Sequence, residues 1–83
     1  MTWSCYILRC ADDTLYTGIT NDLEKRIAAH NEGIASKYTR TRVPVELVFV
    51  EDCVGRSEAS KRESAIKNLT REDKWVLIRS CRS

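Results

Sequence analysis

The sequence lacks long apolar runs, internal repeats, low-complexity tracts and Gly- or Pro-rich linkers. Its longest apolar stretches, Val43–Val50 and Trp75–Ile78, fall far short of the roughly 20 residues that a membrane-spanning helix requires. The N-terminus also lacks the basic region, apolar core and small-residue cleavage site of a secretory leader. We therefore expect a cytoplasmic protein with no membrane association, folded as a single domain over residues 1–83.

Metal-binding and disulfide patterns are absent too. The four cysteines have no CxxC spacing and no nearby pair of histidines, so a zinc site is not expected; they are Cys5, Cys10, Cys53 and Cys81. A disulfide framework would imply secretion, which nothing else in the sequence supports. We interpret the cysteines as small hydrophobic side chains in a reducing compartment.

A strong charge of one sign is also absent. Fourteen Lys and Arg residues against twelve Asp and Glu residues leave a net charge of +2 at pH 7. This small excess permits nucleic acid as a partner, but it fits an ordinary soluble protein equally well. The charge alone therefore does not identify a ligand.

Three strands are predicted from aromatic and β-branched runs. Trp3–Arg9 and Leu15–Ile19 flank Ala11–Thr14, whose two aspartates favour a turn, so the two strands should form a hairpin. Pro44 should open the third strand, Val45–Val50.

Three helices are predicted from residues that cap a helix N-terminus: Asn21 before Asp22–Asn31, Ser57 before a helix to about Asn68, and Thr70 before a helix to Arg79. Trp75–Ile78 would also fit a strand, but Asp73 three residues after Thr70 completes a capping box and favours a helix. Residues 32–42 should be irregular. The order β-β-α-β-α-α predicts an α+β fold, with a small three-stranded antiparallel sheet flanked by three helices.

Two tyrosines stand ten residues apart on the predicted hairpin. Tyr6 and Tyr16 share a face of the sheet only if even-numbered residues of one strand pair with even-numbered residues of the other. A three-residue loop that pairs Cys10 with Thr14 would give this register. Their phenols could then handle a proton together. Ordinary packing of strand tyrosines on a sheet is the alternative.

Arg26 and His30 are one helical turn apart, at the edge of the apolar stripe made by Leu23 and Ile27. A guanidinium held there could bind an anion between helix and sheet. The alternatives are a surface ion pair with Asp22 for Arg26, and a partly buried, carbonyl-bonded imidazole for His30.

Glu63 borders the inward face of its predicted helix, near Ala59 and Ile66 on the helical wheel. A carboxylate placed there needs a partner. It could be a ligand for Mg²⁺, which takes few protein carboxylates and keeps several waters. A buried ion pair with Arg26 or Arg62 is the alternative.

The segment before the third strand mixes cations, hydroxyls and one aromatic ring. Such a mixture can hold a phosphate backbone and stack on a base, although a charged loop is usually only solvated. The candidate nucleic-acid contacts are Lys37, Tyr38, Thr39, Arg40 and Arg42.

Together these residues resemble the GIY-YIG endonuclease domain over nearly the whole chain, Trp3 to about Arg79. Ser4–Tyr6 stands at the first signature triplet and Tyr16–Gly18 at the second. A LYTGIT-like second strand and a KYT segment are similar to those of the small stand-alone YhbQ-like group. By the same resemblance, Arg26 stands at the position of the family's helix arginine, and His30 stands where relatives carry His or Tyr. Glu63 stands at the position of the metal-binding glutamate.

The resemblance implies a metal-dependent endonuclease acting on DNA, possible substrates being structured or damaged forms in repair or recombination. Mg²⁺ or Mn²⁺ would bind Glu63, Arg26 would stabilise phosphate charge, and Tyr6 or Tyr16 with His30 would take a proton from water. Ile19 departs from the lysine found there in the excision-repair nuclease whose incision domain has the same fold. No small-molecule organic cofactor is expected. The alternatives are a non-catalytic nucleic-acid-binding module and a protein-interaction domain.

Overall fold

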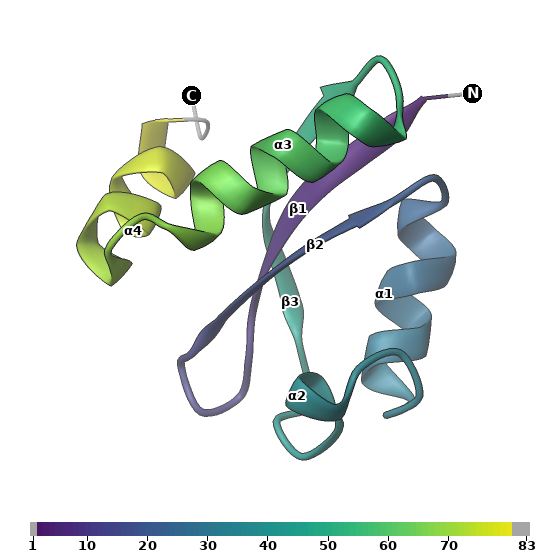
Figure 1. Cartoon of the computed structure of the whole chain (residues 1–83). Coiled ribbons are helices and arrows are strands. Elements are labelled where there is room, and N and C mark those ends of the chain that lie inside the picture. The colour runs from purple at the N-terminus through teal and green to yellow at the C-terminus, as the bar shows by residue number, and fades with distance from the viewer. Residues whose placement is uncertain (1, 81–83) are drawn as a thin grey trace.

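The computed structural model describes residues 2–80, which form three strands and four helices (Figure 1). In chain order these are β1 Trp3–Arg9, β2 Leu15–Thr20, α1 Leu23–Asn31, α2 Lys37–Arg40, β3 Glu46–Cys53, α3 Arg56–Lys67 and α4 Arg71–Ser80. The predicted α+β class and the three-stranded antiparallel sheet are confirmed, and α2 is an additional one-turn helix. Within residues 2–80, no helix is both long and apolar enough to cross a membrane.

The sheet has the strand order β2-β1-β3, with both neighbours antiparallel to the central strand β1. Tyr6 pairs with Gly18 and Leu8 pairs with Tyr16, so even numbers oppose even numbers. The Cys10 amide donates to the Thr14 carbonyl at 2.8 Å, as expected for a three-residue loop. The condition for a shared face is therefore met, and the two tyrosines lie on one face.

Alternation along β1 divides the apolar side chains between two cores, one on each face of the sheet. The face under α3 and α4 buries Cys5, Ile7, Phe49, Cys53, Ala59, Ile66 and Ile78. The opposite face buries Tyr6, Leu8, Cys10 and Val45 against Tyr16, Leu23, Ile27 and Leu47, so α1 covers this side. In Figure 1, β2 runs between α3 and α1. The edge strand therefore separates the helix with Glu63 from the helix with Arg26 and His30.

Several helix starts differ from the prediction. Asp22, not Asn21, caps α1, where its Oδ1 accepts from the Lys25 amide at 3.3 Å. Helix α3 begins at Arg56 after an extended Gly55, and Ser57 lies inside its first turn. Near α4 the expected cap is present, because the Asp73 amide donates to Thr70 Oγ1 at 3.1 Å.

The third strand is longer than predicted, and the segment before it is more regular. Strand β3 continues past Val50 to Cys53, because pairing with β1 extends through Glu51 and Cys53. The prediction of an irregular segment over residues 32–42 is wrong for α2. Ser36 caps this turn by accepting from the Tyr38 amide at 3.1 Å.

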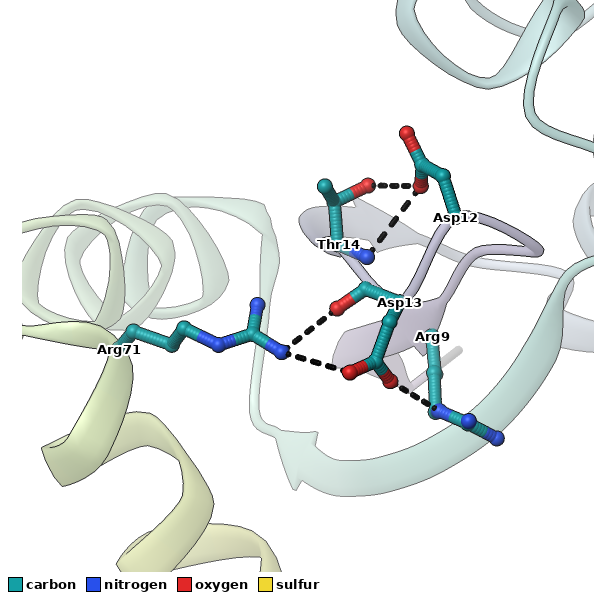
Figure 2. A network of polar contacts seen from close by, with 5 residues as sticks. All are labelled: Arg9, Asp12, Asp13, Thr14 and Arg71. Atoms are coloured by element: carbon teal, nitrogen blue, oxygen red, sulfur yellow. Dashed lines mark hydrogen bonds and ion pairs between the residues drawn. The ribbon is translucent and has the colours of Figure 1, made fainter.

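The hairpin loop is tied to α4 by a network around Asp13 (Figure 2). Asp13 adopts a positive φ of 68°, which aspartate tolerates better than most residues. Its Oδ1 pairs with Arg9 Nε at 2.7 Å, and Arg71 Nη2 donates to its carbonyl at 2.7 Å and its Oδ2 at 3.1 Å. Asp12 accepts from the Thr14 hydroxyl at 2.6 Å. Turn chemistry thus fixes the loop length on which the hairpin register depends.

Candidate active site

The centre of the candidate site is a buried tyrosine bonded to a buried histidine. Tyr6 projects from β1 and His30 from the last turn of α1, and each is only 1% exposed. Tyr6 Oη lies 3.0 Å from His30 Nε2. The alternative of a histidine bonded to a backbone carbonyl does not describe His30, because both of its ring nitrogens contact side-chain hydroxyls.

Gly18 on β2 makes room for the Tyr6 phenol. A Cβ atom at Gly18 would lie 2.6 Å from Tyr6 Oη and 2.8 Å from Tyr6 Cζ. It would also lie 3.2 Å from Tyr16 Cε2. The glycine is thus needed for close approach, since its φ is not in the left-handed region.

Tyr16 approaches the same histidine from β2. Its ring centroid is 5.1 Å from that of His30 in an edge-on arrangement, and 5.8 Å from that of Tyr38 in a stacked one. Tyr16 is partly exposed, and its hydroxyl has no hydrogen bond within residues 2–80. The structure therefore brings both predicted tyrosines to His30 but gives only Tyr6 a direct bond to it.

Burial and neighbouring charge set the protonation of this pair. Burial raises the pKa of Tyr6 strongly; the nearby Tyr16 and Glu63 raise it further, while the Arg26 charge partly opposes them. Burial also lowers the pKa of His30, and Arg26 lowers it again. At neutral pH the phenol keeps its proton, while the imidazole is neutral and keeps one nitrogen free to accept a hydrogen bond.

Arg26 lies on the exposed side of α1, beside a groove lined by Thr20, Asn21, Asp22, Lys25, Arg26 and Ala29. Arg26 does not form the ion pair with Asp22 that was the alternative interpretation of this residue. Within residues 2–80 no carboxylate lies within ion-pair distance of its guanidinium. Arg26 is therefore a cation available to an external anion, close enough to affect the pKa of both Tyr6 and His30.

Glu63 is half-buried on α3, with 25% of its side chain exposed. Its Oε2 lies 3.5 Å from Nζ of Lys67, one helical turn later, and within residues 2–80 it forms no ion pair with Arg26 or Arg62. Arg62 Nε instead lies 2.9 Å from Glu51 Oε2, within ion-pair distance but poorly aligned for a hydrogen bond. The Lys67 pair is long and solvated, so it leaves the carboxylate able to bind another cation.

The small number of neighbouring carboxylates limits the kind of metal site that this region could form. No group of three or more His, Cys, Asp or Glu side chains gathers as a metal cage anywhere in residues 2–80. A Mg²⁺ ion that keeps most of its waters needs only one or two protein carboxylates. Glu63 fits that minimal requirement, and its charge reaches Tyr6 across the β2 edge.

Some of the predicted nucleic-acid contacts are exposed to solvent, and others contact neighbouring side chains of the protein. Lys37 and Arg40 are exposed on α2, and Tyr38 is 37% exposed. The Arg42 guanidinium lies 4.2 Å from the centroid of the Tyr38 ring and pairs with Asp12 at 2.9 Å. Thr39 is fully buried, so its side chain does not reach the surface where we expected it to contact nucleic acid.

Thr39 instead extends the chain of polar groups behind Tyr6. His30 Nδ1 lies 2.8 Å from Thr39 Oγ1, which also lies 3.4 Å from the Ser36 carbonyl oxygen. The prediction that Thr39 contacts nucleic acid is wrong, because its side chain points into the protein. A helix prediction for residues 37–40 with Ser36 as its cap would have shown that only part of this segment can face solvent.

The fold and the paired triplets define a known class of domain. The model of the GIY-YIG catalytic domain matches residues 2–75, and the chain belongs to this family. The predicted family is thus confirmed, with Ser4–Tyr6 and Tyr16–Gly18 on the paired strands β1 and β2.

Within the family, the chain is similar to UPF0213 proteins. The UPF0213 protein CPE1444 of Clostridium perfringens is 57% identical over 75 residues, which cover 90% of this chain and 81% of the relative. The UPF0213 protein DP2720 of Desulfotalea psychrophila is 52% identical over 79 residues, covering 94% and 72%.

Two solution NMR structures share the fold. The UPF0213 protein BH0048 of Bacillus halodurans is 40% identical with a TM-score of 0.61, covering 94% of this chain and 83% of its own. The protein EF2693 of E. faecalis is 37% identical with a TM-score of 0.67, covering 99% and 88%. These likenesses cover nearly the whole chain and agree with the fold described above.

Proposed function

We propose that this protein is a metal-dependent endonuclease that hydrolyses phosphodiester bonds of DNA. The observation that carries the proposal is the buried bond between Tyr6 and a neutral His30, beside an Arg26 with no ion-pair partner within residues 2–80. A proton acceptor next to an anion-binding cation is what hydrolysis of a phosphodiester requires. Membership of the GIY-YIG family supports the same reaction class.

The two tyrosines differ in what they can do. A phenol acts as a general base only if its own proton has an acceptor, and His30 Nε2 provides one for Tyr6 at 3.0 Å. Tyr16 has the exposure that contact with substrate requires. We therefore assign proton transfer to Tyr6 and His30, and substrate contact to Tyr16. Because Tyr6 is buried, bound substrate must shift Tyr16 or its neighbours to admit water.

Tyr6 and His30 together provide a path for the proton of the attacking water. Attacking water gives its proton to Tyr6 Oη as the phenol proton moves to His30 Nε2, and the oxygen of water bonds to phosphorus as the leaving P–O bond breaks. The leaving oxygen departs with the bonding electron pair and takes a proton from solvent, and the His30 imidazolium returns its proton to solvent. Arg26 stabilises charge on the phosphate oxygens. Phosphate bound there also offsets the positive charge that lowers the pKa of His30, which favours proton uptake when substrate is present.

Glu63 is the residue that would hold Mg²⁺ or Mn²⁺. The half-buried carboxylate has only a long, solvated ion pair, which a divalent ion can replace. When bound, the ion supplies positive charge that stabilises the scissile phosphate and leaving oxygen. The remaining ligands would be waters and substrate oxygens.

The surface of α2 favours DNA that contains unpaired bases. Tyr38 presents a partly exposed ring between the cations Lys37 and Arg40. Arg42 and Tyr16 already contact this ring, so a base that is out of its duplex would have to replace one of them to stack on it. The lysine and arginine can hold the adjacent phosphates. We infer that structured or damaged DNA, of the kind met in repair or recombination, is the substrate.

The proposal is tested by incubating purified protein with nicked, branched and intact duplex DNA in Mg²⁺, Mn²⁺ or EDTA. We expect metal-dependent cleavage that falls at least about 100-fold in Glu63→Ala, with DNA binding retained. Glu58→Ala, which removes an exposed carboxylate from the same helix, is the matched control and should cleave normally. Binding without cleavage in every metal and substrate would favour the non-catalytic module.

A further inference from the structure

We propose that Thr39 is a positioning residue that holds His30 in the tautomer protonated at Nδ1, so that Nε2 is the acceptor for the Tyr6 proton. The contact that carries this inference is the 2.8 Å approach of Thr39 Oγ1 to His30 Nδ1, between two almost fully buried side chains. Its catalytic consequence depends on the proposed nuclease function, whereas the tautomer itself does not.

The direction of the hydrogen bonds follows from the Ser36 carbonyl at the end of the chain of polar groups. A carbonyl oxygen can only accept, so we take the Thr39 hydroxyl as the donor to Ser36 O, at 3.4 Å. Threonines in helices often donate to a carbonyl three or four residues earlier. With the hydroxyl turned this way, Thr39 Oγ1 has only lone pairs to offer His30, and Nδ1 carries the imidazole proton.

Helix α2 is built so that Thr39 faces inward. The Ser36 side chain caps the turn through the Tyr38 amide, and the Ser36 carbonyl accepts from the Arg40 amide at 3.1 Å. Within this turn Thr39 is fully buried while its neighbours Tyr38 and Arg40 are exposed. Burying a hydroxyl is costly unless it is hydrogen-bonded, and the contact with His30 satisfies this one.

The other tautomer would disable the proposed proton path. With the proton on Nε2, His30 would present a donor to Tyr6 Oη and could no longer take the phenol proton. Tyr6 is 1% exposed and would then need a different acceptor for its own hydroxyl. A single hydroxyl on α2 thus determines whether the buried pair can accept a proton.

The test uses ¹⁵N NMR of the imidazole, which is unambiguous because His30 is the only histidine in the sequence. At pH 7.5 the wild-type protein should show a protonated Nδ1 and an unprotonated Nε2. Thr39→Val keeps the shape but removes the acceptor, and should move the proton toward Nε2. Thr39→Ser should keep the wild-type spectrum, and so should Thr41→Val, which alters an exposed threonine at the end of the same helix.

Cleavage assays give the second readout. Residues that orient an imidazole through its other nitrogen typically contribute about 10- to 100-fold, so Thr39→Val should lower kcat by that factor with unchanged affinity for DNA. Thr39→Ser should retain at least half of the activity.

Three results would overturn the inference. They are a wild-type imidazole protonated at Nε2, a Thr39→Val spectrum with Nδ1 still fully protonated, and a Thr39→Ser spectrum moved toward Nε2. If Thr39→Val does not fold, the wild-type and Thr39→Ser spectra still decide the matter. If the wild type cleaves no DNA, the proposed function fails while the NMR result still stands or falls by itself.

Discussion

Replacing Gly18 by alanine should disturb the candidate site more than any other single methyl group. The added Cβ would lie 2.6 Å from Tyr6 Oη and 2.8 Å from its Cζ, both below normal contact distance. The ring cannot simply swing away, because Tyr6 is almost fully buried and bonded to His30. Either the phenol moves and its hydrogen bond is lost, or β2 moves away from β1.

The expected cost follows from these two routes. Overpacking of a buried site costs about 1–3 kcal/mol, and loss of one intramolecular hydrogen bond adds about 0.5–1.5 kcal/mol. Alanine also restricts the unfolded chain, which returns about 0.4–1 kcal/mol. The net expectation is a destabilisation of about 0.5–4 kcal/mol, together with a displaced Nε2 resonance of His30.

Urea unfolding monitored by circular dichroism measures this change. At a slope of about 1 kcal/mol per molar urea, the midpoint should fall by about 0.5–4 M. Gly55→Ala is the control without a clash, because nothing lies within 4 Å of a Cβ there; it should lose only about 0.5–1 kcal/mol, from the poorer N-cap that alanine makes for α3. Combining Gly18→Ala with Tyr6→Phe should recover part of the loss, since the nearest clashing atom is gone. A Gly18→Ala protein as stable as wild type, with an unmoved His30 resonance, would refute the packing argument.

Three further predictions concern titration and the hairpin loop. Burial raises the pKa of the Cys5 thiol from 9.0 to about 11, so the stability that the neutral thiol contributes is complete below pH 9 and is lost as pH rises through 11. Between pH 8 and pH 11, the free energy of unfolding measured in urea should fall by on the order of 1–2 kcal/mol less in Cys5→Ala than in wild type. Because burial lowers the pKa of His30 below its ordinary 6.5, stability should decrease as pH falls below 6.5, and an NMR titration that finds a His30 pKa above 6.5 would contradict this. Arg71→Ala removes exposed contacts to the loop, so calorimetry should find a loss of no more than about 1 kcal/mol, smaller still in 0.5 M salt, and a loss several times larger would show that the network is more than a surface one.

The hairpin was the part of the fold that local sequence determined best. The aspartates of the loop specify its turn, and loop length then fixes which residues of β1 and β2 oppose each other. That parity was enough to place Tyr6 and Tyr16 on one face. Strand ends were less predictable, because β3 continues to Cys53 only through its pairing with β1.

The side-chain partners of the site could not be read in the same way. Thr39 contacts His30 across nine residues, and the direction of its side chain depends on how a single turn of helix docks on α1. No periodicity can be detected in four residues. The partner of Glu63 was in principle readable, because Lys67 follows at the i+4 spacing that favours a glutamate–lysine pair.

The alternation of β1 has a consequence for how this domain can vary in length. Neighbouring residues of the strand serve opposite cores, so a shift of the hairpin by one position would present Ile7 to α1 and turn Tyr6 toward α3. A single residue inserted or deleted in the Asp12–Asp13 turn would risk such a shift. This loop should therefore keep its present length wherever the chemistry is retained.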